Sequence, residues 1–570
     1  MPDPFAALPP SPAAYLQAAR RVEAGEVGDL RPLRVAVLST FTAEFLAPYL
    51  RVEGARRGLA LTPWFAPWGQ LEEQALDPAS ALYAERPEAV VVLARIEDQP
   101  DFPARAGALL AALRRHSVAR LLLANFAPPA RLAAGLADPS LPLPEASATQ
   151  QANDALAAAC RAVPDAFIFD FARLVVEHGV AAWVDARLFH LARLPFGVNA
   201  QIALGRRLAR TLRAAFFPPA KVLVLDLDHT LWGGVLGEDG LGGIALGDAY
   251  PGNVFQAFQR YLATLQTRGV LLAIASKNNA ADVDELFARH QDLVLRREDF
   301  VAARINWEPK SDNLRAIAAE LNLGLDSFVF LDDSPFEREE VRRALPMVQV
   351  LDFPPSPLGL IAAVEDSGCF DRLALGAEDR ARTDLYRAQS VRRAAEEMAG
   401  SREEFLASLG LVATIGTVDA ETLPRVAQLL AKTNQFNLTA RRHGAAEVQA
   451  LLAAGAVALW LRLADRLGDH GLVGVALAVP GEPWRVDSFL LSCRVIGRGV
   501  ETALLARLCE VVAARGGQEL VGEYVPTAKN GIVADFYPRH GFVAADGGTW
   551  RLALAAGAVQ CPPSIVIRPV

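Results

Sequence analysis

The chain has 570 residues, of which 52% are hydrophobic and 21% charged, and its net charge is -8. This length and composition indicate a globular protein of three or four domains and exclude a disordered chain. The negative charge, without any basic block, argues against a nucleic-acid-binding protein. No apolar run reaches the length of a membrane span, and the first residues lack the basic region and apolar core of a secretory signal. Five cysteines without a CxxC pair favour a reducing cytoplasm.

Residues 1–217 are predicted to form an α/β domain with a parallel sheet. After a short helix in the first 30 residues, four apolar runs predict buried strands, at 33–40, 89–96, 120–127 and 166–175. Helical stretches, the first at 43–57, separate them, and this alternation favours right-handed crossovers. The order resembles an SGNH-hydrolase or flavodoxin-like sheet.

Ser39, Asp185 and His190 are the residues that could form a nucleophilic triad in such a domain. The usual GDS string is absent, and no GxND-type loop stands at VVVLARIED. A serine at a strand end is more often a turn or cap residue. The domain is therefore expected to be non-catalytic, a scaffold that covers a neighbouring site or docks a partner.

The stretch around which the chain is organised follows the linker FFPPAK. An apolar run at 222–225 precedes Asp226 and Asp228, and a Gly-rich turn follows. Such a run predicts a buried parallel strand, and parallel sheets place ligands at the carboxyl ends of their strands. Two carboxylates at such an end each need a partner, and the natural partner is a divalent cation.

The DxDxT spacing of Asp226 to Thr230 resembles the first motif of the haloacid dehalogenase (HAD) phosphohydrolases. Three further motifs follow in order: Ser276 ends the run LLAIAS, Lys310 lies in WEPKSDN, and Asp332 with Asp333 ends FVFLDD. A Rossmann-like HAD domain is expected over 218–375. The intervals between motifs leave no room for a cap, so another domain covers the site or the substrate is large.

The resemblance implies roles for the carboxylates. Asp226 would attack phosphorus, and Asp228 would protonate the leaving oxygen and later activate water. Mg²⁺ would be held by Asp226, the backbone carbonyl of Asp228 and Asp332, with Asp333 as a further ligand or a residue behind the ligands.

The same resemblance implies a phosphate-binding set. Ser276 would hydrogen-bond the phosphate, Lys310 would clamp it as a point charge, and Thr230 would position the loop. For Lys310 the alternative is an exposed loop lysine.

Longer strings narrow the resemblance: LWGGVLGEDG, KTNQFNLTARR, DRLGDHGLVG, FLLSCRVIGRGVE and PTAKNGIVADFYPRHGF are similar to the FkbH-like branch of the HAD superfamily, subfamily IIIC. The likeness is close from Lys221 onward and loose before it. It implies polyketide-type biosynthesis, in which a phosphorylated three-carbon acid, 1,3-bisphosphoglycerate, supplies a glyceryl unit to an acyl carrier protein.

Two positions depart from that branch. Many glyceryl-loading members carry a Cys between the motif aspartates as the candidate acceptor, whereas Leu227 stands here and cannot form a thioester. This excludes glyceryl capture at the position and brings the glyceryl substrate into question. His229 stands where Asn is common, and it could hydrogen-bond locally as Asn does or perturb the loop.

Residues 376–404 are predicted as a charged helical connector and 405–570 as an α+β domain. Ser401 is a predicted N-cap, and strand-like runs follow at 411–416, 456–465, 472–479 and 484–493. A Gly-rich turn then opens a helix. This pattern resembles the GNAT-type acyltransferase fold.

Arg494, Gly497, Arg498 and Gly499 fit the RxxGxG pyrophosphate loop of that fold. Glycines and backbone N–H groups at a helix N-terminus would bind the phosphopantetheine of a carrier protein or CoA. The plain alternative is a glycine turn before a helix. The same resemblance makes Tyr537, in FYPRHGF, a candidate general acid.

Cys493, beside Arg494 and a helix N-terminus, is the remaining candidate for an acyl-enzyme, and a buried structural cysteine is the alternative. Asp469 and His470 form a possible acid–base pair, with His470 as the general base.

The loop KTNQFN carries Asn434, Gln435 and Asn437, polar side chains that could contact the hydroxyls of an acyl group.

Three functions remain open. The first is a two-site enzyme that removes phosphate and transfers an acyl group to a carrier thiol. The second is a Mg²⁺ phosphatase acting on another phosphorylated small molecule, with a separate CoA- or carrier-dependent acyl transfer; Leu227 favours it. The third is a non-catalytic recruitment module, against which the intact Asp226, Asp228, Lys310 and Asp332 argue.

Overall fold

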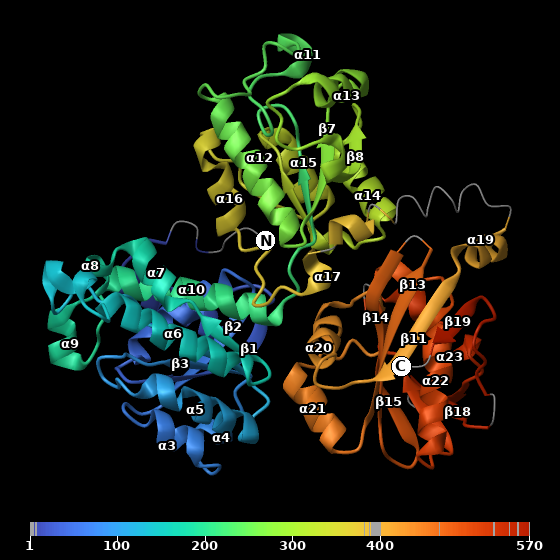
Figure 1. Ribbon diagram of the computed structural model, residues 1–570, viewed down its shortest axis with the longest axis horizontal. Helices are drawn as coiled ribbons and strands as arrows, with labels where there is room; N and C mark the ends of the chain where they lie inside the picture. Colours follow the sequence, from blue (N-terminus) through green and yellow to red (C-terminus); the bar gives the residue numbers. More distant parts are fainter. Residues whose placement is uncertain are drawn as a thin grey trace. The chain divides into compact units, whose positions relative to one another are not determined.

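The computed structural model describes residues 5, 8–380, 382–386, 388, 401–466, 468–527, 530–545, 548–555 and 558–568. The chain divides into two compact units, and Figure 1 labels their helices and strands. One contains Met1–Phe217 with Gly444–Gln449, and the other contains Pro218–His443 with Ala450–Val570. Of the predicted helical connector, residues 381, 387 and 389–400 lie outside the described residues.

The N-terminal sheet has five parallel strands in the order β2-β1-β3-β4-β5. The strands are β1 Arg31–Ser39, β2 Leu59–Phe65, β3 Ala89–Leu93, β4 Arg120–Ala124 and β5 Ala166–Phe169. The helices are α1 Pro12–Glu23, α2 Ala47–Ala55, α3 Leu71–Leu76, α4 Ala81–Ala84, α5 Phe102–His116, α6 Glu145–Arg161, α7 Phe171–His178, α8 Val180–Trp183, α9 Ala186–Ala192 and α10 Val198–Phe216. All residues along the second half of β1 are buried, so both faces of the strand are covered, as expected in a parallel sheet.

The central sheet is also parallel, in the order β10-β9-β6-β7-β8. Its strands are β6 Val222–Leu225, β7 Leu271–Ser276, β8 Phe300–Ile305, β9 Phe328–Leu331 and β10 Gln349–Val350. The helices are α11 Leu236–Asp239, α12 Gly252–Thr267, α13 Ala280–Arg289, α14 Lys310–Leu321, α15 Pro335–Ala344, α16 Leu360–Asp366 and α17 Ala377–Arg380.

Two apolar clusters hold this central sheet. Alternate residues of β6 enter opposite clusters, so the strand is buried on both faces. Between β6 and α12 the only helix is the single turn α11, and no cap domain is present there.

The C-terminal sheet is mixed, in the order β17-β18-β16-β15-β14-β13-β11-β19, with β12 paired to β15. Its strands are β11 Leu411–Thr417, β12 Phe436–Asn437, β13 Val457–Asp465, β14 Gly468–Val479, β15 Trp484–Leu491, β16 Glu519–Glu523, β17 Val543–Ala545, β18 Thr549–Ala553 and β19 Ile565–Arg568. The helices are α19 Arg402–Leu409, α20 Leu423–Lys432, α21 Ala445–Ala453, α22 Val500–Ala514 and α23 Phe536–Arg539. Ser401 caps α19 by accepting a hydrogen bond from the Glu404 amide, as predicted.

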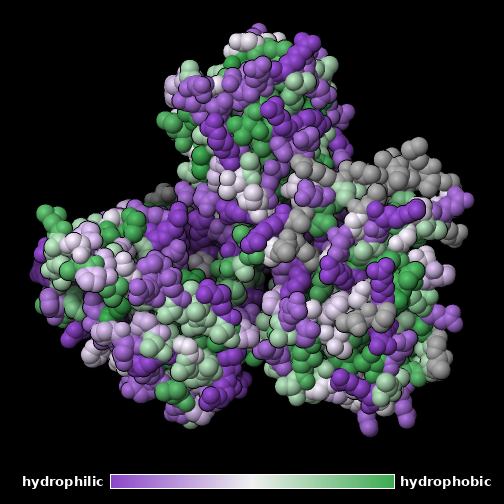
Figure 2. All heavy atoms as spheres, viewed as in Figure 1, coloured by the Kyte–Doolittle hydropathy of each residue, from purple (hydrophilic) through white to green (hydrophobic). Residues whose placement is uncertain are grey.

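The predicted fold class, a multidomain α/β protein with two parallel sheets and a C-terminal α+β domain, is confirmed, and the C-terminal sheet is mixed. Hydrophilic and hydrophobic side chains are interspersed over the face drawn in Figure 2. Among the described residues, no helix combines the length and the apolar character that crossing a membrane requires.

Candidate active site

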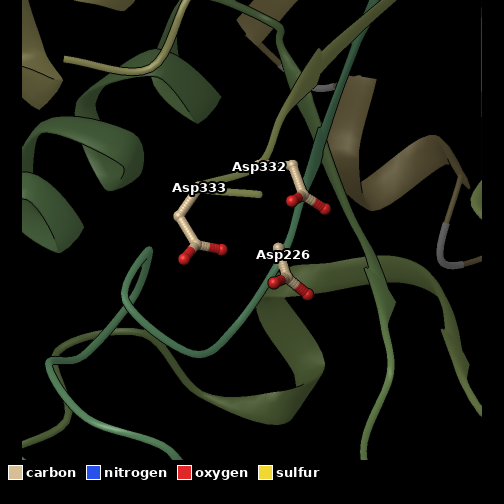
Figure 3. A group of neighbouring side chains, drawn as sticks. All are labelled: Asp226, Asp332 and Asp333. Atoms are coloured by element: carbon tan, nitrogen blue, oxygen red, sulfur yellow. The ribbon is translucent and has the colours of Figure 1, made fainter. Parts of the chain in front are cut away.

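Three carboxylates meet at the carboxyl end of the central sheet (Figure 3). Asp226 follows the middle strand β6, and Asp332 with Asp333 follows its neighbour β9. One oxygen from each lies within 4.8 Å of the others. Burial and then the Asp226 carboxylate raise the pKa of Asp332 to about 7, and the same two causes raise the pKa of Asp333. This crowded set of oxygen donors fits Mg²⁺, whose charge would relieve the repulsion between them.

Lys310 provides a positive charge beside these carboxylates. Its Nζ donates to Asp226 Oδ1 at 2.7 Å and to the Ala275 carbonyl at 2.6 Å, and lies 2.9 Å from Asp332 Oδ2. The residue is 1% exposed and occupies the first position of α14, where the helix dipole disfavours a cation. Burial alone would lower the pKa of Lys310, but the two carboxylates outweigh it and raise that pKa. An exposed loop lysine, the alternative considered above, is therefore excluded.

The Asp228 side chain lies outside the three-carboxylate group. Its Oδ1 accepts hydrogen bonds from Trp232 Nε1 at 2.8 Å and the Leu236 amide at 3.1 Å, and its Oδ2 accepts one from Asn278 Nδ2 at 2.8 Å. These donors orient the carboxylate on the loop after β6. Any contribution of Asp228 to a metal would come from its backbone carbonyl, as the resemblance implied.

Sequence reasoning did not single out Trp232 or Asn278. The available signal was position alone: Trp232 follows the DxDxT motif in LWGG, and Asn278 comes two residues after Ser276.

Ser276 and Thr230, the other two predicted phosphate-binding residues beside Lys310, are both buried. Ser276 ends β7, the other neighbour of β6. Thr230 is fully buried, and its hydroxyl has no hydrogen-bond partner among the described residues. Their contacts with phosphate remain predictions.

The two departures from the FkbH-like pattern have different consequences. His229 has a left-handed backbone (φ 55°), a conformation in which Asn and His are enriched, and its Nδ1 accepts a hydrogen bond from the Gly234 amide at 3.3 Å. It thus hydrogen-bonds locally, the first of the two alternatives. Leu227 lies in the apolar cluster with Leu225 and Trp232. Leu227 is fully buried there, so its side chain gives no polar or nucleophilic atom to the carboxylate site.

The Gly-rich loop of the C-terminal sheet opens α22 as predicted. Gly497 and Gly499 have φ of 82° and 81°, and Gly499 is the N-cap of the helix. Left-handed values of this kind favour glycine. Arg494 lies in the single 3₁₀ turn that begins at Cys493, and its Nε donates to Ser492 Oγ at 3.2 Å.

Arg498 and His470 belong to a buried cluster behind that loop. Asp465 Oδ2 lies 2.9 Å from His470 Nε2 and 3.3 Å from Arg498 Nη1, and the His470 and Arg498 nitrogens are 3.0 Å apart. The predicted pairing of His470 with Asp469 is therefore wrong, because Asp469 forms an exposed ion pair with Arg462. His470 is 1% exposed, so as a general base it would need the cluster to open.

Cys493 and Tyr537 have surroundings that the sequence did not indicate. The Cys493 thiol lies 3.7 Å from the Tyr386 hydroxyl, and its carbonyl accepts from Asn322 Nδ2 at 3.0 Å. Tyr537 is buried in the core, where its ring packs against Gly522. Burial raises the pKa of Tyr537. The structure places both as packed side chains, and their catalytic roles remain predictions.

Two strands, β16 and β12, pair with different parts of the same edge of β15. The strand β15 pairs with β16 only at Trp484 and Arg485, and beyond that point it pairs with β12. The Leu438 carbonyl accepts from the Val525 amide at 2.8 Å, which joins this segment to the chain after β16. The space left by the two diverging strands is therefore filled by the protein's own backbone.

The polar loop KTNQFN, which leads into β12, makes hydrogen bonds within the protein. Asn437 Oδ1 accepts from the amides of Thr439 and Ala440, and Asn434 Oδ1 accepts from Arg442. A residue not predicted, the buried Asn530, donates to the Asn437 carbonyl at 2.9 Å. For Asn437, a turn-forming role replaces the expected contact with an acyl group.

The triad considered for the N-terminal domain is not assembled. Ser39 Oγ donates to the Phe41 carbonyl at 2.6 Å, and Asp185 caps α9 by accepting from the Leu188 amide at 2.9 Å. His190 is exposed on α9. Each has a local structural contact or faces solvent, as the non-catalytic interpretation expects.

The strand order, the carboxylates after β6 and β9, and the lysine at the start of α14 define a HAD-like domain with a candidate cation site. Among solved structures, the chain is similar to the N-terminal part of the protein BF1531 from Bacteroides fragilis, which contains a phosphatase domain and is complexed with Mg. The two are 27% identical, with 63% of this chain and 99% of that chain covered and a TM-score of 0.56.

Two further solved structures are similar to about a quarter of the chain. A putative GNAT acetyltransferase from Desulfovibrio desulfuricans is 20% identical, with 25% of this chain and 99% of that chain covered and a TM-score of 0.21. The GNAT N-acetyltransferase YhbS from Escherichia coli, in complex with CoA, is 18% identical, with 27% and 88% covered and a TM-score of 0.20. Scores this low support no conclusion, so the C-terminal fold rests on its own strand order. No protein-family model and no curated protein matches the chain.

Proposed function

We propose that the central domain is a Mg²⁺-dependent phosphatase of the HAD type. The observation that carries the proposal is the buried ion pair of Lys310 with Asp226 and Asp332, together with an Asp333 oxygen within 4.8 Å of an oxygen of each carboxylate. Buried charges this close are costly unless a function or a ligand uses them. The Mg-bound phosphatase domain of the similar Bacteroides structure supports the assignment.

The resemblance to the HAD phosphohydrolases implies the reaction, and the positions of the side chains support it. A carboxylate oxygen of Asp226 attacks phosphorus, the bond from phosphorus to the leaving oxygen breaks, and Asp228 gives that oxygen a proton. Water then attacks phosphorus with Asp228 as the base, which releases phosphate and restores Asp226. The hydrogen bonds from Trp232 and Asn278 hold Asp228 in place for both transfers.

The positive charges of the site would stabilise the phosphoryl group during the reaction. Mg²⁺, held by Asp226, Asp332 and Asp333, would neutralise the phosphoryl oxygens. Lys310 supplies a fixed charge that needs no reorganisation during the reaction. Because the domain has no cap, water must be excluded by another part of the chain or by a large substrate.

The finer proposal couples this phosphatase to acyl transfer. One molecule of 1,3-bisphosphoglycerate, one carrier thiol and one water would yield a glyceryl thioester and two phosphates. The thiol takes the acyl group from its phosphate, and the central domain hydrolyses the remaining phosphate ester. The FkbH-like strings and the helix-opening glycine loop at Gly497 and Gly499 support this reading.

The alternative is a phosphatase for another phosphorylated small molecule, with a C-terminal domain that uses CoA or a carrier separately. Leu227 favours it, because a leucine between the two motif aspartates cannot accept a glyceryl group as a thioester. In this reading phosphate release does not depend on a carrier protein.

The experiment supplies Mg²⁺, enzymatically generated 1,3-bisphosphoglycerate and a panel of holo-acyl carrier proteins, and follows carrier mass and phosphate together. A glyceryl mass shift with phosphate release is the expected result of the coupled reaction. Phosphate release without carrier modification would support the alternative. Asp226→Asn should abolish enzymatic release of the ester phosphate, whereas Asp312→Asn, at an exposed ion pair of the same domain, should not.

A further inference from the structure

The N-terminal domain contains a cavity of about 250 Å³ that the proposed phosphatase does not use. Thr40, directly after β1, and Asp98 with Gln99, after β3, contribute to its lining. The strand order β2-β1-β3 means that the chain crosses from one side of β1 to the other. Ligands of open parallel sheets bind at such a switch point, outside the carboxyl ends of the strands.

Hydrogen bonds fix the floor and one wall of this cavity. Thr40 Oγ1 donates to Asp98 Oδ2 at 3.3 Å and accepts from the Arg95 amide at 3.0 Å. Trp68 Nε1 donates to the Thr40 carbonyl at 3.0 Å, which holds the indole as a wall. Gln99 Oε1 is buried and has no hydrogen-bond partner among the described residues. The cavity thus combines an apolar face with fixed acceptors.

Arg193 provides a cation at the same cavity. Its guanidinium lies 5.8 Å from the ring centroid of Trp68 and 5.4 Å from that of Phe189, and the described residues place no carboxylate within ion-pair distance of it. Its backbone has φ 53°, a strained value for a residue with a side chain. The Thr42 amide donates to the Arg193 carbonyl at 3.0 Å and so secures this conformation. Strain of this kind concentrates at ligand sites.

We propose that this cavity binds a small hydroxy acid, with its carboxylate on Arg193, its hydroxyl donating to Asp98 or Gln99, and its carbon chain against Trp68. The volume equals about eight water molecules at roughly 30 Å³ each, which suits an acid of a few carbons. Charge-assisted pairing with a guanidinium selects the carboxylate, and the fixed acceptors select the hydroxyl. The domain would bind without hydrolysing, because Ser39 Oγ is engaged by the Phe41 carbonyl.

Calorimetric titration of the full chain tests this proposal, with a chelator present to remove metal from the central domain. D-glycerate carries both groups, acetate only the carboxylate and glycerol only the hydroxyls. We expect glycerate to bind with one-to-one stoichiometry and the other two at least about tenfold more weakly. Arg193→Gln and Asp98→Asn should each weaken glycerate binding about tenfold or more. Arg187→Gln, at an exposed position on helix α9, which ends just before Arg193, should leave it unchanged.

Tryptophan fluorescence gives a second readout. Glycerate should change the emission of the wild type but not that of Trp68→Phe, while circular dichroism verifies that each variant is folded. No glycerate binding up to about 10 mM, or equal affinity in Arg193→Gln, would overturn the proposal. Binding that Asp226→Asn abolishes and Arg193→Gln preserves would place the acid in the central domain and would also overturn it, without bearing on the phosphatase.

Discussion

Replacing Lys310 by methionine keeps most of the side-chain length but removes the ammonium from between two carboxylates. Asp226 and Asp332 lie 2.7 and 2.9 Å from that ammonium, and Lys310 and Asp332 are fully enclosed. Breaking a buried pair by removing one partner costs about 3–5 kcal/mol. For a domain of this size each kcal/mol lowers the melting temperature by roughly 2–4 °C, so the central domain should melt about 6–20 °C lower.

Differential scanning calorimetry without metal measures this change, with Lys277→Met as the matched control. Lys277 pairs with Glu337 at the same distance of 2.7 Å, but the lysine is one-third exposed. A pair of that kind contributes about 1 kcal/mol or less, so the control should melt within roughly 4 °C of the wild type. Added Mg²⁺ should restore part of the loss in Lys310→Met, because a cation at the carboxylates replaces the missing charge. A Lys310→Met transition no lower than that of Lys277→Met would refute the reasoning.

Three further predictions concern other parts of the chain. Asn278→Ala removes a hydrogen bond to the Asp228 carboxylate and should lower kcat for phosphate release about 10- to 100-fold, and an unchanged kcat would contradict its positioning role. Burial alone would raise the pKa of Glu53, but the surrounding guanidinium groups lower it, so its contribution to stability is present above its ordinary pKa and lost as the pH falls. The melting temperature should therefore fall with decreasing pH more steeply in the wild type than in Glu53→Gln. Parallel plots of melting temperature against pH would exclude a stabilising contribution from the Glu53 carboxylate. Gly522→Ala would place a methyl group 2.1 Å from the Tyr537 ring and should destabilise the C-terminal domain by about 1–3 kcal/mol, whereas Gly531→Ala, with open space, should be neutral by calorimetry.

The central domain was predictable because its signals are local. A run of buried apolar residues ending in carboxylates, Asp226 after β6 and Asp332 after β9, identifies adjacent strand ends in a parallel sheet. The strand β2 was missed because Pro63 interrupts its run. It is an edge strand, where the missing N–H of proline is tolerated.

Side-chain partners across the fold were less predictable. Asp469 and His470 are adjacent in sequence, but successive residues of a strand point to opposite faces, so only His470 reaches the buried Asp465. A register shift near the end of the β13–β14 hairpin adds to this, and nothing in the sequence indicates it. Asn278 reaches Asp228 from another strand end, a contact that depends on the assembled sheet.

The most direct test of the account is phosphate release from a panel of phosphorylated small acids, measured for the wild type and Asp226→Asn with Mg²⁺ and with a chelator. The account predicts release by the wild type only when Mg²⁺ is present and none above background by Asp226→Asn. Equal release by the two proteins, or release that a chelator leaves unchanged, would contradict the assignment of Asp226 as the nucleophile of a magnesium-dependent phosphatase.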